Sequence, residues 1–281
     1  MTIPSLAFCG LSDIGLNRAN NEDVWVALPE IGFFALADGM GGHQAGEVAA
    51  KEAIESLCRS IQHLASHPEL NSSDLIIAIR KAIEKTNRRV YELGRERALF
   101  NGMGTTLCCL YWTKKAVIYC HVGDSRIYRL RAGKLDLLTQ DHSLFARLVA
   151  RFKHLGEEPK SSYPYKHVIT RAVGTSRKAN PEIALSTYEP GDLFLLCSDG
   201  LSDVLTLKDI EKILERAPSL EESAVHLIEK AKIKGSSDNI TVLLVKIHAN
   251  HLSRQQFNNA SRSESSFSHD GRPERSSGEP L

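Results

Sequence analysis

Apolar residues follow two different spacings along the chain, and each spacing predicts a different kind of element. Short apolar runs between turn residues predict strands, whereas apolar residues three and four positions apart predict amphipathic helices. The predicted strands cover residues 6–11, 24–28, 32–37, 105–111, 116–121, 127–130, 135–138, 168–170, 183–188, 193–197 and 240–247. The predicted helices cover residues 54–65, 72–94, 143–153, 207–214 and 221–233.

The order of these elements indicates the fold class. Strands follow strands and helices come in pairs, so the regular strand–helix alternation of a parallel sheet is missing from the pattern. We therefore expect an α+β fold of mainly antiparallel sheets covered by helices. Aliphatic residues become rare after residue 248, so we assign residues 1–248 to one domain. Residues 249–281 form a Ser-, Arg- and Asn-rich tail that we expect to be disordered.

Composition and charge exclude several classes of protein. Hydrophobic residues make up 42% and charged residues 25%, which is the ordinary mixture of a globular protein. The net charge of +1 gives no basic footprint for nucleic acid, and no apolar run approaches the roughly 18 residues of a membrane span. The six cysteines form no Cys-x-x-Cys pair, which favours free thiols in a reducing compartment. We expect a soluble, cytoplasmic monomer.

Acidic residues stand at the ends of the predicted strands, which is the informative feature of this sequence. Five strand ends carry such acids, namely Glu22–Asp23, Asp38, Asp124, Asp199 and Asp238. One acid at a strand end is an ordinary turn residue, but several that converge would share a poorly hydrated place at a cost of several kcal/mol each. Divalent cations would offset that cost. Oxygen ligands without a His or Cys cluster favour Mg²⁺ or Mn²⁺, which commonly meet phosphate groups.

Eight segments around these acids resemble one known family. They occur in the family's order at residues 18–23, 37–43, 102–106, 122–126, 139–143, 169–174, 197–203 and 235–241. The sequence is similar to the metal-dependent protein Ser/Thr phosphatases, the PPM or type 2C family, and to its bacterial branch in particular. Each segment is weak evidence alone, whereas all eight in order over most of residues 6–248 are specific.

The resemblance implies a four-layer sandwich of two mostly antiparallel sheets flanked by pairs of helices. It also implies a centre of two Mn²⁺ or Mg²⁺ ions at one end of the sandwich. In the family's pattern, Asp38 bridges the two ions. Asp199 and Asp238 hold one ion, and Glu22 with the carbonyl of Gly39 holds the other.

Further roles follow from the same resemblance. Asp23 would orient a metal-bound water, and Arg18 would bind the substrate phosphate without touching the metal. A third, weaker ion would use Asp124 and Asp203 together with Asp199. Arginine suits the phosphate role because its planar fork matches two phosphate oxygens.

Two departures from the family's pattern concern proton transfer and substrate access. Eukaryotic members have a histidine after the Asp-Gly pair, where this chain has Met40 as bacterial members do. We keep His43, in the same glycine-rich turn, as a candidate for proton transfer beside a metal-bound water. The flap, about residues 144–167, lacks the His-Pro-x-x-Asn motif that bacterial members often carry. We interpret His121 and His142 as structural.

The predicted function is hydrolysis of phosphoserine and phosphothreonine in proteins, reversing a cognate Ser/Thr kinase. In the implied mechanism, a hydroxide that bridges the ions attacks phosphorus in line with the leaving oxygen. A phosphatase of small phosphate esters and a catalytically silent regulatory module of the same fold stay open as alternatives. A two-metal nuclease would need a basic groove, which the sequence does not provide.

Overall fold

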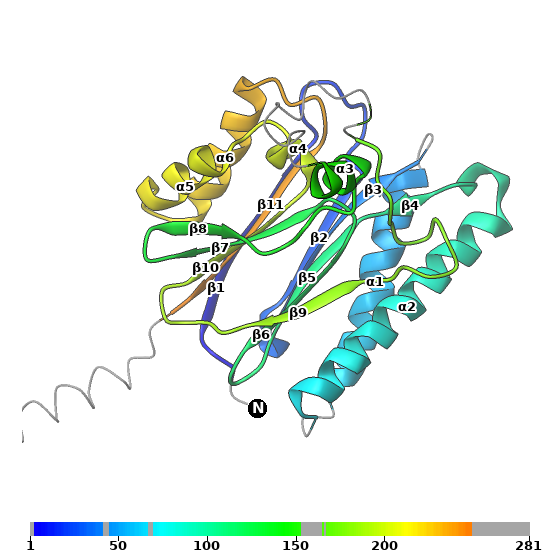
Figure 1. Ribbon diagram of the computed structural model, residues 1–281, viewed down its shortest axis with the longest axis horizontal. Coiled ribbons are helices and arrows are strands. Elements are labelled where there is room, and N and C mark those ends of the chain that lie inside the picture. Colours follow the sequence, from blue (N-terminus) through cyan, green and yellow to red (C-terminus); the bar gives the residue numbers. More distant parts are fainter. Residues whose placement is uncertain (1–2, 42–44, 67–69, 153–164, 166, 249–281) are drawn as a thin grey trace, which may run out of the picture. The chain divides into compact units, whose positions relative to one another are not determined.

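The computed structural model describes residues 3–41, 45–66, 70–152, 165 and 167–248. These residues form two antiparallel sheets packed face to face, with helices on both outer faces (Figure 1). The predicted α+β sandwich is confirmed.

The first sheet has five strands in the order β1–β11–β10–β7–β8. Their bounds are β1 Leu6–Asp13, β11 Ile240–Ile247, β10 Leu193–Cys197, β7 Arg126–Arg131 and β8 Lys134–Leu137. Its outer face packs against α5 (Leu207–Arg216) and α6 (Leu220–Ile233). α5 begins with a capping box, in which the Thr206 hydroxyl and the Asp209 carboxylate each accept a backbone N–H of the other residue.

The second sheet has the order β2–β3–β5–β6–β9, and β4 pairs with the end of β3. The bounds are β2 Asp23–Leu28, β3 Phe33–Met40, β4 Gly104–Thr105, β5 Leu107–Trp112, β6 Val117–Val122 and β9 Glu182–Ser186. Its outer face packs against the long helices α1 (Ala45–Ala65) and α2 (Ser72–Glu96). Shorter helices are α3 (Leu144–Arg151), α4 (Asp199–Ser202), η1 (Pro29–Ile31) and η2 (Ala98–Phe100).

β3 is buried on both faces, which explains why its sequence is a continuous apolar run. Ala35 and Ala37 face the helices, whereas Phe34 and Leu36 face the other sheet. Between the sheets, the Trp112 ring meets the rings of Phe34 and Phe194 edge to face, at centroid distances of 5.4 and 5.5 Å. The apolar contacts between the two sheets therefore hold the strand ends in fixed positions.

Three elements differ from the sequence-based prediction. The strand predicted at 168–170 is wrong, because that segment makes only an isolated bridge between Ser143 and Ile169. α1 begins nine residues before the predicted helix. Its first turns bury alanines and Gly46 against β3, and such small residues give a weak hydrophobic signal. The four-residue α4 was not predicted, because one helical turn has no period to detect.

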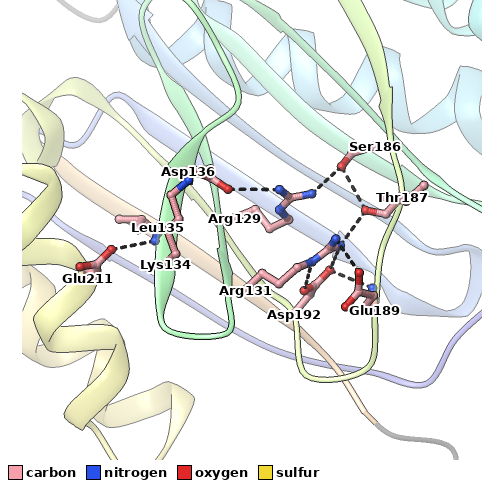
Figure 2. A network of polar contacts seen from close by, with 10 residues as sticks. All are labelled: Arg129, Arg131, Lys134, Leu135, Asp136, Ser186, Thr187, Glu189, Asp192 and Glu211. Atoms are coloured by element: carbon pink, nitrogen blue, oxygen red, sulfur yellow. Dashed lines mark hydrogen bonds and ion pairs between the residues drawn. The ribbon is translucent and has the colours of Figure 1, made fainter.

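A network of ion pairs joins the two sheets at the beginning of β10 (Figure 2). Arg131 of β7 donates to both carboxylate oxygens of the buried Asp192, at 2.8 and 2.6 Å, and to Glu189 at 2.8 Å. Its neighbour Arg129 donates to Ser186 at the end of β9. Asp199 follows the other end of β10, so this network holds the strand at the end remote from that acid.

None of the helices in the described ranges is long and apolar enough to cross a membrane.

Candidate metal centre

The β2–β3 hairpin places three of the predicted site residues together. Its register sets Asp23 directly opposite Asp38. Glu22 precedes β2, and its carbonyl accepts the N–H of Gly39 at 3.0 Å. The Asp38 N–H donates to the Thr106 hydroxyl at 2.9 Å, so β3 is held from its other side as well. The pairing of β2 with β3 therefore fixes Glu22, Asp23 and Asp38 at one end of the second sheet.

The other sheet brings Asp199 and Asp238 to the same place. Ser198, just before Asp199, donates its hydroxyl to Asp23 Oδ2 at 2.8 Å. Asn239, just after Asp238, accepts the backbone N–H of Glu22 with Oδ1 at 2.8 Å. These two side chains join the sheets at the acidic end.

Gly39 has no room for a side chain. A Cβ at this position would lie 2.1 Å from the carbonyl oxygen of Gly46 and 2.8 Å from that of Glu22. The glycine therefore lets the N-terminal turn of α1 approach the end of β3.

The acids lie close enough together to raise one another's pKa values. Burial raises the pKa of Asp38 well above its ordinary value, and repulsion from Asp23, Asp199 and Asp124 raises it further. Burial also raises the pKa of Asp199, and repulsion from Asp124 and Asp203 adds to it. Burial is the main cause of a raised pKa at Glu22 too. The fold thus confines several negative charges in a place with little water.

Asp124 and Asp203, the predicted ligands of a third ion, lie beside Asp199. Asp124 is 3% exposed and follows Gly123 at the end of β6. Asp203, at the end of α4, has a carboxylate oxygen that lies within 4.8 Å of ligand atoms of both Asp199 and His167. His167 Nδ1 is 3.2 Å from Asp203 Oδ2. His167 belongs to the predicted flap, and nothing in the sequence pattern assigned it to this group of acids.

Arg18 lies in the loop between β1 and β2 and points into the acidic cluster. Its Nη2 donates to Asp238 Oδ2 at 2.6 Å, and Glu22 and Asp38 are close enough to raise the pKa of the guanidinium further. The side chain is 48% exposed, so the guanidinium is also open to a ligand from solvent. Arg18 thus pairs with one of the predicted metal ligands, Asp238.

Two histidines near Gly123 are structural, in line with the sequence interpretation. The His121 and His142 rings stack at 4.4 Å, and with Glu182 they form a group whose ligand atoms lie within 4.8 Å. However, His142 Nδ1 accepts the Gly123 N–H, so Nε2 carries the proton and donates to Glu182 at 3.1 Å. Burial lowers the pKa of His142 to about 4, so the ring is neutral at pH 7. This tautomer holds the turn that precedes Asp124.

His43 and most of the flap, residues 153–164 and 166, lie outside the described residues. Sequence reasoning gave no role to Asn239, Ser198 or Thr106, which place the acids through hydrogen bonds. All three lie in the matched segments. Asn239 follows Asp238, Ser198 precedes Asp199, and Thr106 ends the segment 102–106. Position alone did not distinguish them from turn residues.

The residues at this end of the sandwich fit hard divalent cations. The donor atoms are carboxylate and carbonyl oxygens, the ligands that Mg²⁺ and Mn²⁺ prefer. The Asp23 Oδ1 atom is buried without a hydrogen-bond partner among the residues that the structure describes. Among the described residues, Arg18 forms an ion pair with one carboxylate of this cluster, that of Asp238. Cations would offset the remaining charge.

The pH dependence of stability tests the burial of Asp23. Burial raises the pKa of Asp23 to about 6, against 3.8 for an ordinary aspartate. Between these values the folded state binds more protons than the unfolded state, so this residue's contribution to stability falls as pH rises. We therefore expect Asp23→Asn, in EDTA, to gain melting temperature over the parent as pH rises from about 4 to 7. A constant difference across that range would contradict this prediction.

Comparisons with known proteins agree with this geometry. The family model described as protein phosphatase 2C matches residues 17–234. The chain belongs to the protein phosphatase 2C family. Within it, the chain is 35% identical over 238 residues to a serine/threonine phosphatase of Listeria welshimeri, covering 84% of this chain and 93% of that protein. The sequence-based resemblance, and with it the predicted enzyme class of serine/threonine protein phosphatase, is confirmed.

Solved structures of the 2C family share the fold. The Mycobacterium tuberculosis serine/threonine phosphatase PstP/Ppp superposes with a TM-score of 0.79 at 36% identity, over 87% of this chain and 99% of that one. A structure of the PstP catalytic domain in complex with two manganese ions gives a TM-score of 0.74 at 34% identity, over 87% of this chain and 99% of that one. Metal ions thus accompany this fold in a relative.

Proposed function

We propose that this chain is a metal-dependent phosphatase of phosphoserine and phosphothreonine in proteins, using Mn²⁺ or Mg²⁺. One observation carries the proposal: seven carboxylates from both sheets converge at one end of the sandwich, with a single arginine among them. The seven are Glu22, Asp23, Asp38, Asp124, Asp199, Asp203 and Asp238. Clustered oxygen donors beside a guanidinium suit a phosphate held between cations.

The residues that would hold two ions are Asp38, Asp199, Asp238 and Glu22, together with the Gly39 carbonyl. Asp124 and Asp203, with Asp199, would hold a weaker third ion. When bound, the ions supply positive charge for the phosphoryl oxygens and lower the pKa of water.

The chain's own residues then bind and orient the reactants. Arg18 is exposed at the cluster's edge, where its N–H groups can reach two oxygens of a phosphoryl group. Asp23 lies opposite Asp38 in the β2–β3 register with Oδ2 fixed by Ser198, so its buried Oδ1 would accept a hydrogen bond from a water held at the cluster. The proposal keeps His43 as a candidate proton donor to the leaving serine or threonine oxygen.

The alternatives differ in substrate and in turnover. A phosphatase of small phosphate esters would use the same acids, and a silent regulatory module would not turn over at all. The intact acids oppose the silent module, and the relatives named serine/threonine phosphatases support protein substrates. We propose a phosphoprotein substrate, a cognate Ser/Thr kinase, and action as a monomer in the cytoplasm. The six free cysteines support the cytoplasmic location, because free thiols persist in a reducing compartment.

Release of phosphate from a phosphothreonine peptide tests the proposal. The assay uses Mn²⁺, the parent protein and the Asp38→Asn variant, with a sugar phosphate as the competing substrate. Faster turnover of the peptide than of the sugar phosphate supports a protein phosphatase. The reverse preference would favour the small-ester alternative, and no turnover of either would favour the silent module.

Arg18→Ala separates phosphate binding from metal binding. A charge-assisted hydrogen bond contributes about 1.5–3 kcal/mol, so we expect kcat/KM for the phosphopeptide to fall roughly 10- to 150-fold. Because Arg18 pairs with Asp238, its removal frees that carboxylate, and Mn²⁺ affinity should stay equal or increase. Arg18→Lys should recover part of the loss, since one ammonium cannot span two oxygens. Unchanged kinetics, or weaker Mn²⁺ binding by calorimetry, would contradict this role.

We also propose residues 1–248 as the catalytic domain and residues 249–281 as a tail dispensable for catalysis. The tail lies outside the described residues, and its composition supports the proposal. Truncation after Ile247 should leave hydrolysis of a small phosphate ester and the melting temperature within error of the parent. A large decrease in either quantity would show that the tail stabilises the domain.

A further inference from the structure

A surface pocket of about 610 Å³ lies on α2, outside the acidic cluster. Five of its lining residues belong to α2, and the sixth comes from the loop after Gly174. They are Arg88, Tyr91, Glu92, Arg95, Glu96 and Arg177. All three arginines are exposed.

Two of the arginines meet at one phenolic oxygen. The Arg95 Nη1 atom donates to the Tyr91 hydroxyl at 3.0 Å, and its guanidinium carbon lies 5.6 Å from the centre of the ring. Hydrogen bonds from Arg177 and Arg95 hold the pKa of Tyr91 below its usual value. A phenol oxygen can accept from only a few of the five N–H groups that each arginine carries. Both arginines therefore keep N–H groups that the phenol does not use and that a ligand in the pocket can take.

The pocket has an excess of positive charge that is not neutralised within it. In the part of the chain that the structure describes, no ion pair joins Arg88, Arg95 or Arg177 to Glu92, Glu96 or any other acid. Three guanidinium groups outnumber the two carboxylates. Guanidinium forks match the paired oxygens of phosphoryl and carboxylate groups.

Hydrogen bonds fix the pocket relative to the acidic cluster. The fully buried Asn87 of α2 accepts the Gly174 N–H at 2.8 Å and donates to the Ser176 carbonyl at 3.0 Å. Val173 exchanges two backbone hydrogen bonds with Thr105, and Thr105 pairs with Gly39 on its other side. The loop that carries Arg177 thus begins about two strand spacings, roughly 10 Å, from Gly39.

We propose that this pocket binds an anionic side chain of the substrate protein, at a distance from the phosphorylated residue that is hydrolysed. The anion is a second phosphoryl group or a short run of Asp and Glu. This inference rests on the proposed function. An extended chain spans about 3.3 Å per residue, so the second anion lies several residues from the reacting one.

Paired peptides test the inference. Each peptide carries one phosphothreonine and, two to eight residues away, a phosphoserine, three glutamates or a neutral segment. For the parent, we expect kcat/KM to be roughly 3- to 10-fold higher for an anionic peptide than for the neutral peptide, at one of the spacings tested. In the double variant Arg88→Ala/Arg177→Ala this ratio should fall close to one. An equal ratio for the neutral and anionic peptides in the parent would overturn the inference.

Two further variants control for charge and for folding. Lys81→Ala/Lys85→Ala removes the same number of positive charges, both from α2. These lysines line a different groove, so this variant should keep the parent's ratio. Tyr91→Phe removes the phenol oxygen and keeps the arginines, so it should keep or increase the ratio. Loss of the ratio in either control would overturn the assignment to the arginines. A larger effect of phosphoserine than of glutamates identifies a second phosphoryl group as the ligand, and the reverse identifies carboxylates.

A binding measurement separates this inference from the proposed function. Fluorescence anisotropy of labelled peptides in EDTA does not depend on hydrolysis. If no peptide is hydrolysed but the anionic peptides bind more tightly to the parent than to Arg88→Ala/Arg177→Ala, the proposed function fails and the pocket stands. If the peptides are hydrolysed and bind both proteins equally, the pocket fails and the function stands.

Discussion

Asp38→Asn should lose at least about 100- to 1,000-fold in kcat at saturating Mn²⁺, the range found when a single charge-stabilising group is removed from an active site. Asp38 is half-buried at the centre of the acidic cluster, and its pKa is raised by desolvation and by four neighbouring aspartates, Asp23, Asp199, Asp124 and Asp238. An amide at this position removes the charge that would lie between the two ions. Phosphate release from a phosphothreonine peptide measures the effect.

The same substitution should not destabilise the metal-free protein. Because the folded state raises the pKa of Asp38, its charged form is less stable in the folded protein than in the unfolded chain at neutral pH. We expect the melting temperature in EDTA at pH 7 to rise by about 2–4 °C for each kcal/mol of repulsion relieved.

Asp136→Asn is the matched control for this experiment. Asp136 of β8 pairs with Lys134 of the same strand and with Arg129 of β7, and these partners lower its pKa. Its substitution should leave kcat unchanged and should not raise the melting temperature. Near-normal turnover of Asp38→Asn, or a melting temperature that falls more than that of Asp136→Asn, would contradict the assignment of Asp38 to the metal centre.

Removal of divalent cations should abolish phosphatase activity, and Mn²⁺ should restore it. The donor atoms of the cluster are oxygens, and Arg18 pairs with one of its carboxylates, that of Asp238. Alkylation of thiols under native conditions should leave activity largely intact. Cys108, Cys109, Cys120 and Cys197 are buried, and burial raises the pKa of Cys197 to about 12.

The melting temperature gives a second readout of metal binding. A ligand at 100 times its Kd stabilises the folded state by about 2.7 kcal/mol, which corresponds to roughly 5–10 °C for a domain of this size. Mn²⁺ should produce this shift in the parent and a smaller one in Asp38→Asn. Full activity of protein shown by elemental analysis to be metal-free would refute the proposed centre.

The strands and the acids at their ends could be predicted from the sequence. A run such as Phe33–Ala37 is apolar at every position because β3 is buried on both faces, and Asp38 follows where the strand leaves the core. Local apolar patterns report burial directly, so the α+β class and most strand bounds followed from them, whereas the packing of two sheets into a sandwich followed only from the family resemblance. The order of eight short segments then predicted the family, which no single segment could do.

The tertiary structure alone decided how these ends meet. Ser198 bonds to Asp23 across 175 positions of sequence, Asn239 to Glu22 across 217, and Arg18 to Asp238 across 220. No local pattern encodes such pairs, because each partner reads as an ordinary turn residue in its own segment. Sequence therefore determined which carboxylates stand at the strand ends, whereas the packing of two sheets determined which carboxylate the arginine neutralises and which pKa values rise.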